Sequence, residues 1–172
     1  MQSMTIRRAL ARDAERLTAL VQESGAYSGA YASIISGYRV TADYIARHEV
    51  FVAVGPDGRV LGFYALVLDP PELDLAFVAD DAQGAGVGRL LVRHMTDRAR
   101  DAGLPGVKVV AHPPAEEFYR RLGARRVGVV APTPPRIGWE RPQLWFDTGA
   151  GTPAAATSDV AAAGDVPRGQ RR

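Results

Sequence analysis

The apolar and polar positions of this chain repeat with two different periods, and the changes of period predict strands and helices in alternation. Short runs rich in β-branched and aromatic residues predict strands at 5–9, 50–54, 60–68, 72–78, 107–111, 125–130 and 143–146. Apolar residues spaced three and four apart predict helices at 12–22, 41–47, 86–101 and 115–122. The order of these elements is that of an α/β (α+β) domain.

Glycine, proline and capping residues mark the predicted boundaries. Gly55-Pro56-Asp57-Gly58 predicts a hairpin turn between the second and third strands. Thr41 is a suitable N-cap for the second helix, and Gly103 ends the third. The inner face of that third helix is expected to carry Val87, Leu90, Leu91, His94 and Met95.

The composition changes after Thr148. Residues 149–172 consist mainly of Ala, Gly, Pro, Ser and Thr, without a periodicity that could bury an apolar face. Such a segment cannot offset the entropy lost on ordering, so we expect a disordered C-terminal tail at 149–172. The folded domain is then expected at 4–148.

Composition excludes several functional classes. The net charge of +2 is too small to indicate a nucleic-acid partner. Cysteine is absent, which excludes disulfides and a cysteine acyl-enzyme, and the three scattered histidines predict no metal site. The N-terminus lacks the apolar segment of a signal peptide, and no apolar run is long enough to span a membrane. The sequence therefore predicts a cytoplasmic protein with no membrane partner.

A glycine-rich stretch, Gln83-Gly84-Ala85-Gly86-Val87-Gly88, joins the strand at 72–78 to the helix at 86–101. Glycines at such a junction let backbone N–H groups converge at the positive end of a helix, which favours an anion such as pyrophosphate. A turn whose glycines serve only packing remains open. Rossmann and Walker loops do not fit, because Arg89 stands where they require glycine or lysine.

The spacing Gln83-x-x-Gly86-x-Gly88, after an apolar strand, resembles the acetyl-CoA loop of the GNAT superfamily of N-acyltransferases. The later stretch 115–123 (AEEFYRRLG) resembles the same superfamily, and the similarity covers most of 4–147. It implies a mixed, mostly antiparallel central sheet of about six to seven strands flanked by about four helices. Two departures are His112-Pro113-Pro114, where many members carry an asparagine, and Ala124, where an aromatic residue is usual.

The resemblance implies roles for particular residues, with acetyl-CoA as acyl donor and no metal. Main-chain groups of Phe77 and Val78 are expected to contact the pantetheine arm and the thioester oxygen. Tyr119 matches the general acid that protonates the CoA thiolate; a structural tyrosine is the alternative. The pyrophosphate is assigned to Gln83, Gly84, Ala85, Gly86, Val87, Gly88 and Arg89.

Two carboxylates are candidate general bases. Glu72 and Asp74 lie two apart on a predicted strand and so share a face, and Glu72 falls where some family members carry a base that acts through water. A solvated strand edge is the alternative for both. His112 is a weaker candidate, and His94 is expected to be a core histidine.

The resemblance implies an N-acetyltransferase that moves an acetyl group from acetyl-CoA to a primary amine by direct attack in a ternary complex. The alternative is a non-catalytic acyl-CoA-binding or sensing module. The acceptor, a small molecule or a peptide amine, should bind between 23–47 and 131–141. Four aromatic residues there could form its wall: Tyr27, Tyr31, Tyr38 and Trp139. The sequence does not distinguish a monomer from a homodimer.

Overall fold

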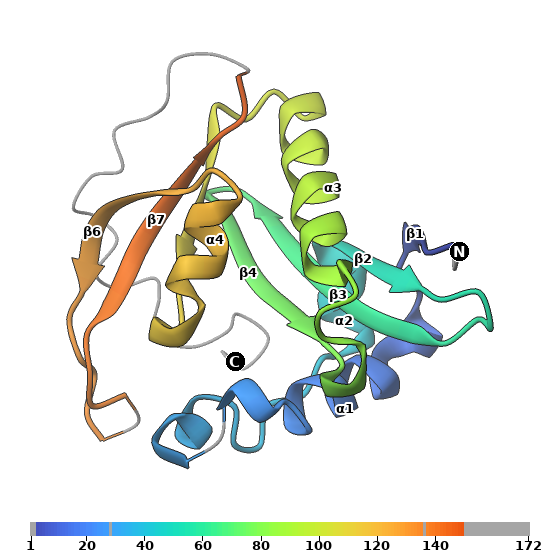
Figure 1. Cartoon of the computed structure of the whole chain (residues 1–172), viewed down its shortest axis with the longest axis horizontal. Coiled ribbons are helices and arrows are strands. Elements are labelled where there is room, and N and C mark those ends of the chain that lie inside the picture. Colours follow the sequence, from blue (N-terminus) through green and yellow to red (C-terminus); the bar gives the residue numbers. More distant parts are fainter. Residues whose placement is uncertain (1–2, 28, 136, 150–172) are drawn as a thin grey trace.

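The computed structural model describes residues 3–27, 29–135 and 137–149. A seven-stranded sheet forms its centre, in the order β1-β2-β3-β4-β5-β7-β6 (Figure 1). Its strands are β1 (Thr5–Arg8), β2 (Glu49–Val54), β3 (Val60–Leu68), β4 (Pro71–Val78), β5 (Gly106–Val110), β6 (Arg125–Val130) and β7 (Arg141–Asp147). Only β4 and β5 pair in parallel among the described strands. The predicted mixed, mostly antiparallel sheet is confirmed.

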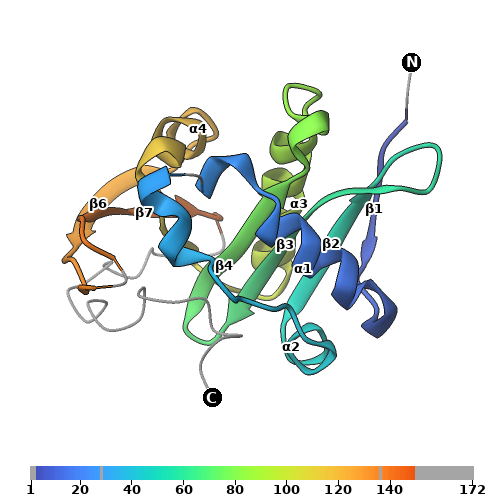
Figure 2. The same cartoon turned by 90° about the horizontal axis from the view of Figure 1, so that it is seen from below.

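Helices cover both faces of this sheet. They are α1 (Ala14–Gln22), α2 (Ala42–Arg47), α3 (Val87–Asp101) and α4 (Glu116–Arg121). Figures 1 and 2 show α3 and α4 on one face and α1 and α2 on the other. The segment after α1, expected to be a loop, contains the 3₁₀ turns Gly25–Tyr27 and Gly29–Ile34.

The predicted helix cap at Thr41 and much of the predicted apolar face of α3 are present in the structure. The Thr41 hydroxyl oxygen accepts a hydrogen bond of 3.1 Å from the Tyr44 amide and caps α2. On α3, Val87, Leu91 and Met95 are buried, as their spacing predicts. Three other residues of α3 differ from the prediction in their burial. Val92 and Ala99 are buried although they were not predicted to be, and Leu90 is only half-buried.

The pairing of β4 with β5 consists of one residue pair, Glu72 with Lys108. Beyond that pair the two strands separate, so the edge of β4 that faces away from β3 has no strand partner in the described structure. A β-bulge adds to the divergence: Ala65 and Leu66 of β3 pair with Leu75 and Leu73. Asp74 is therefore the extra residue, and such bulges bend a strand.

The limits of the domain remain a prediction, because the expected tail at 149–172 lies outside the described residues except for Gly149. Of the helices that the structure describes, none has the length and apolar character needed to cross a membrane.

Candidate active site

A cleft of about 560 Å³ opens where β4 and β5 separate. Its walls come from β4, the glycine-rich loop, the start of α3, the end of β5, and α4. The lining residues used below are Tyr27, Glu72, Asp74, Phe77, Val78, Gln83, Gly84, Gly86, Gly88, Arg89, His112, Phe118, Tyr119 and Arg141. Most of the residues predicted for the site thus meet at one cavity. Ala85 is exposed and does not line the cleft. Val87 lines the cleft, but its side chain is buried in the core.

The loop owes its shape to two glycines. Gly84 and Gly86 have φ values of 81° and 85°, in the left-handed region that side chains with a Cβ rarely adopt. Gly86 is the N-cap of α3 and has no side chain to bond the first amides of the helix. Those amides have no acceptor within the helix, and the helix dipole is positive there. The loop therefore offers backbone donors and a favourable field to an anion.

Gly88 has a different role. A Cβ added at this position would lie 2.9 Å from Cζ of Phe118. The missing side chain therefore lets α4 approach the first turn of α3. Part of the packing alternative for this loop is thus correct, because one of its glycines serves a helix contact.

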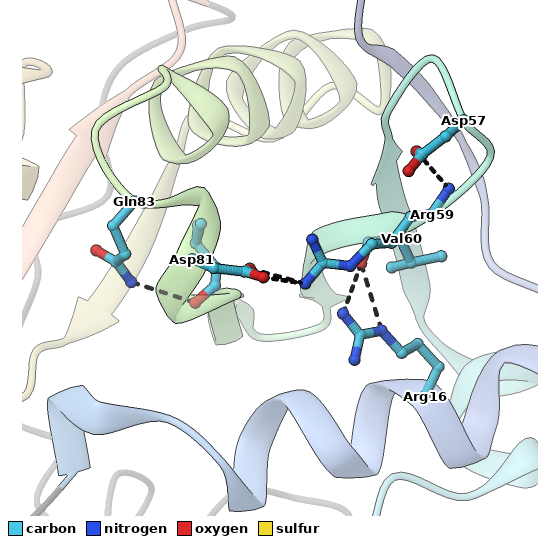
Figure 3. A network of polar contacts seen from close by, with 7 residues as sticks. Arg16, Asp57, Arg59, Val60, Asp81 and Gln83 are labelled. Carbon is cyan, nitrogen blue, oxygen red and sulfur yellow. Dashed lines mark hydrogen bonds and ion pairs between the residues drawn. The ribbon is translucent and has the colours of Figure 1, made fainter.

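Polar contacts with neighbouring segments fix the position of the glycine-rich loop (Figure 3). The Gln83 side-chain amide donates to the Val78 carbonyl oxygen at 3.2 Å, which ties the loop to the end of β4. Arg59, just after the β2–β3 turn, donates to both carboxylate oxygens of Asp81 at 2.7 and 2.8 Å. Both partners are substantially exposed, so this pair contributes little stability and mainly fixes a position.

Asp80 connects the start of the loop to the 3₁₀ turn Gly25–Tyr27, whose Tyr27 lines the cleft. Its carboxylate oxygens accept hydrogen bonds of 3.1 and 3.0 Å from the Gly25 amide. A Cβ at Gly25 would lie 2.9 Å from an Asp80 oxygen, so glycine permits this approach. Neither the contact of Asp80 nor that of Asp81 was predicted from the sequence.

Tyr119 lies on α4, only 9% exposed, with its ring edge against Phe146. Burial raises the pKa of Tyr119 to about 12. Its hydroxyl therefore remains protonated across the working pH range and can donate a hydrogen bond. Burial and then the nearby Tyr119 also raise the pKa of Tyr27, whereas Arg141 acts in the opposite direction. Two hydroxyls and a guanidinium thus act on one another at this end of the cleft.

The two candidate carboxylates have different environments. Glu72 is only 3% exposed, and its Oε1 lies 3.5 Å from Nζ of Lys108. The Asp74 carboxylate accepts a hydrogen bond of 2.6 Å from the Tyr44 hydroxyl of α2. The bulge interrupts the strand alternation on which their shared face was predicted, yet both line the cleft. Glu72 is not on a solvated edge, and neither Lys108 nor Tyr44 was identified from the sequence.

A group of aromatic rings extends outward from one end of the cleft, where Tyr27 and His112 line it. The Tyr27 ring stacks on His112 with centroids 4.3 Å apart, and Tyr31 meets His112 edge-on at 4.4 Å. Trp139 in turn meets Tyr31 at 4.8 Å. These four residues are the aromatic wall. Tyr38, also expected there, is fully buried in the hydrophobic core.

His94 lies away from this wall. It is half-buried, its Nδ1 lies 2.7 Å from the Tyr64 hydroxyl, and burial lowers its pKa. Across the described ranges, no three His, Asp or Glu side chains form a group that could hold a metal ion.

Comparison with known proteins agrees with this architecture. The family model described as an acetyltransferase (GNAT) domain matches residues 17–131. Streptothricin acetyltransferase of Streptomyces lavendulae is 36% identical over 85 residues, which cover 45% of each chain. This chain therefore spans less than half the length of that relative.

Two further proteins match over more of their length. Peptidyl-lysine N-acetyltransferase YjaB of Salmonella typhimurium is 25% identical over 130 residues, covering 73% of this chain and 86% of that protein. A crystal structure of an acetyltransferase of the GNAT family from Desulfovibrio desulfuricans superposes with a TM-score of 0.69 at 18% identity, covering 86% of this chain and 100% of the other. The family match over most of the described domain, together with the shared fold, shows that this chain belongs to the GNAT family of acyl-CoA-dependent N-acetyltransferases.

Proposed function

We propose that this protein transfers an acetyl group from acetyl-CoA to a primary amine by direct attack in a ternary complex within the cleft. The observation that carries this proposal is the convergence on one cavity of about 560 Å³ of the glycine-rich loop, the part of β4 beyond its pair with β5, Tyr119 and Glu72. That volume is in the ordinary range for small-molecule sites, roughly 300–1,000 Å³.

The donor side of the cleft fits acetyl-CoA. In this proposal Gln83, Gly84, Ala85, Gly86, Val87, Gly88 and Arg89 hold the pyrophosphate, through the amides and dipole at the start of α3. Arg89 is exposed at the cleft and adds a positive charge. The edge of β4 at Val78 supplies main-chain groups for the pantetheine arm and for the oxygen of the tetrahedral intermediate. Phe77 pairs through its main chain with Phe63 of β3, so it contributes its side chain to the cleft wall.

Tyr119 is assigned to stabilise the leaving group, the CoA thiolate. The amine nitrogen forms a bond to the acetyl carbon, and the carbon–sulfur bond then breaks and leaves a thiolate. A thiol in water has a pKa of ~8.5, below that of Tyr119, so the tyrosine hydroxyl holds its proton more tightly than a free thiol does. We infer that Tyr119 stabilises the developing thiolate through a hydrogen bond and that the proton is finally supplied from solvent.

The amine must lose a proton, since a lysine-like ammonium has a pKa near ~10.4. We assign this proton to Glu72, directly or through water, with Asp74 and His112 as the other acceptors in the cleft. Removal of the proton leaves the neutral amine that attacks. The aromatic wall and these carboxylates suit a cationic amine, whose attraction to ring faces is well established.

The names of two relatives, an acetyltransferase of streptothricin and one of peptidyl-lysine, support an acceptor that is either a small molecule or a peptide amine. The test is thiol release from acetyl-CoA with a panel containing streptothricin, polyamines and lysine peptides. We expect one class to raise thiol release far above the rate with water alone. Tight acetyl-CoA binding without release for any amine would instead indicate the non-catalytic binding module.

A further inference from the structure

The one residue pair that joins β4 to β5 is also an ion pair. Lys108 and Glu72 are opposite each other in the ladder, with Nζ and Oε1 3.5 Å apart. Both side chains are more than nine-tenths buried. The pair therefore lies at the point from which the cleft opens, and Glu72 lines that cleft.

Lys108 is an unusual residue for its position. It is the single lysine among 21 basic residues of the chain, and it follows Val107 in the buried strand β5. Removing an ammonium from water is costly, and apolar residues in place of a buried ion pair are often neutral or stabilising. The placement is explained if the charge itself is needed beside Glu72.

Several other titratable groups lie near Glu72 or line the same cavity. Asp74 lies on the same strand, Tyr44 comes from α2, and Tyr64 from β3 lines the same cavity. At the opposite wall are His112, Arg141 of β7, and the hydroxyls of Tyr27 and Tyr119. Burial and the neighbouring carboxylate of Asp74 both favour the protonated, neutral form of Glu72. The Lys108 ammonium acts in the opposite direction.

We propose that Lys108 is a positioning residue that keeps Glu72 ionised and directed into the cleft, so that Glu72 can accept the proton of the amine at neutral pH. This inference rests on the role given to Glu72 in the proposed function. Without the ammonium, Glu72 takes up its proton at a higher pH, and the protonated form cannot act as a base. The loss of activity is then recovered as the pH rises.

The first test needs no activity. Because Lys108 is the single lysine, labelling an untagged protein with lysine enriched at 13Cε gives one side-chain NMR signal. We expect this signal to shift as Glu72 titrates, and we expect the shift to be absent in Glu72→Gln. A signal with no Glu72-dependent step would overturn the inference and leave the proposed function intact.

The second test is the pH dependence of kcat/KM for acetyl transfer in Lys108→Met and Lys108→Arg. For Lys108→Met we expect the acidic limb to move up by about one pH unit or more, the effect of an opposite charge at this distance. The charge-retaining Lys108→Arg should restore the wild-type profile. Lys108→Gln replaces the Met variant if that protein does not fold.

An acidic limb that stays in place in Lys108→Met would also overturn the inference, since a merely structural lysine affects stability but not the profile. If the NMR step is present but no amine is acetylated by the wild type, the proposed function fails and the base role of Glu72 fails with it. That result is distinct from a missing NMR step.

Discussion

Gly86 gives the sharpest test of the anion-binding loop. It is the N-cap of α3 and lines the cleft, next to the helix amides assigned to the pyrophosphate. Gly86→Asp adds both bulk and a negative charge there. Nothing lies within 4 Å of the added Cβ, so the substitution itself should not disrupt packing.

The expected size of the effect follows from linkage. A ligand present at one hundred times its Kd stabilises the native state by about 2.7 kcal/mol. For a domain of this length, that corresponds to a rise in Tm of roughly 5–10 °C. The variant itself should lose about 1–2 kcal/mol through the left-handed backbone conformation. We therefore expect a modestly lower Tm in the absence of ligand and no rise with acetyl-CoA.

Gly58→Asp is the matched control. Gly58 has the same φ of 85°, is exposed in the β2–β3 turn and also has nothing within 4 Å of an added Cβ. It should show a similar loss of stability but keep the full rise with acetyl-CoA. Thermal unfolding of wild type and both variants, with and without acetyl-CoA, measures this. A normal rise in Gly86→Asp would refute the assignment of the loop.

Three further predictions follow from other parts of the molecule. Gly88→Val should separate α4 from α3, because the valine side chain would collide with Phe118. The affinity for acetyl-CoA, measured by calorimetry, should fall at least tenfold, and an unchanged affinity would contradict this packing role. Asp13→Asn should cost about 1–3 kcal/mol at pH 7. The hydrogen bond from Arg7 lowers the pKa of Asp13, so its contribution is present above the unfolded pKa of ~3.9 and is lost as the pH falls through the lower, native value. Urea unfolding of wild type and Asp13→Asn should therefore show a difference in the free energy of unfolding that is smaller at pH 3 than at pH 7. An equal difference at both pH values would contradict this prediction. Deleting 150–172 should leave Tm and the acetyl-CoA response unchanged, since that composition offers no apolar face; a fall of several degrees would show that the segment contributes to the domain.

Local patterns were sufficient for much of the fold. The Gly55–Gly58 turn, the Thr41 cap and the apolar periodicity each depend on residues close in sequence, and the predicted strands agree with the structure within two residues at each end. Strand β7 was predicted at 143–146, which is shorter than the observed strand Arg141–Asp147. In the structure Pro142 lies within the strand, and its carbonyl accepts from the Ala111 amide. A proline is tolerated where its missing N–H is not needed.

Long-range contacts limited the prediction of the site. The spacing of the glycine loop and Tyr119 indicated their role through a family resemblance. By contrast, the ion pair of Glu72 with Lys108 depends on which strands become neighbours, as does the hydrogen bond from Tyr44 to Asp74. No local signal in the sequence reports such pairings. The bulge at Asp74 is likewise visible only from the register with β3.

The central claim is that Tyr119 assists the departure of CoA in this cleft, and Tyr119→Phe tests it most directly. The variant removes one hydroxyl and retains the ring that packs on Phe146. With the best amine of the panel, single-turnover thiol release should fall by about 10²–10³-fold, the usual cost of removing one donor to a developing anion, while the Kd of acetyl-CoA changes little. Because the pKa of Tyr119 is about 12, the wild-type rate should show no alkaline decline from this group below about pH 11. Thiol release at the wild-type rate in Tyr119→Phe would contradict the account.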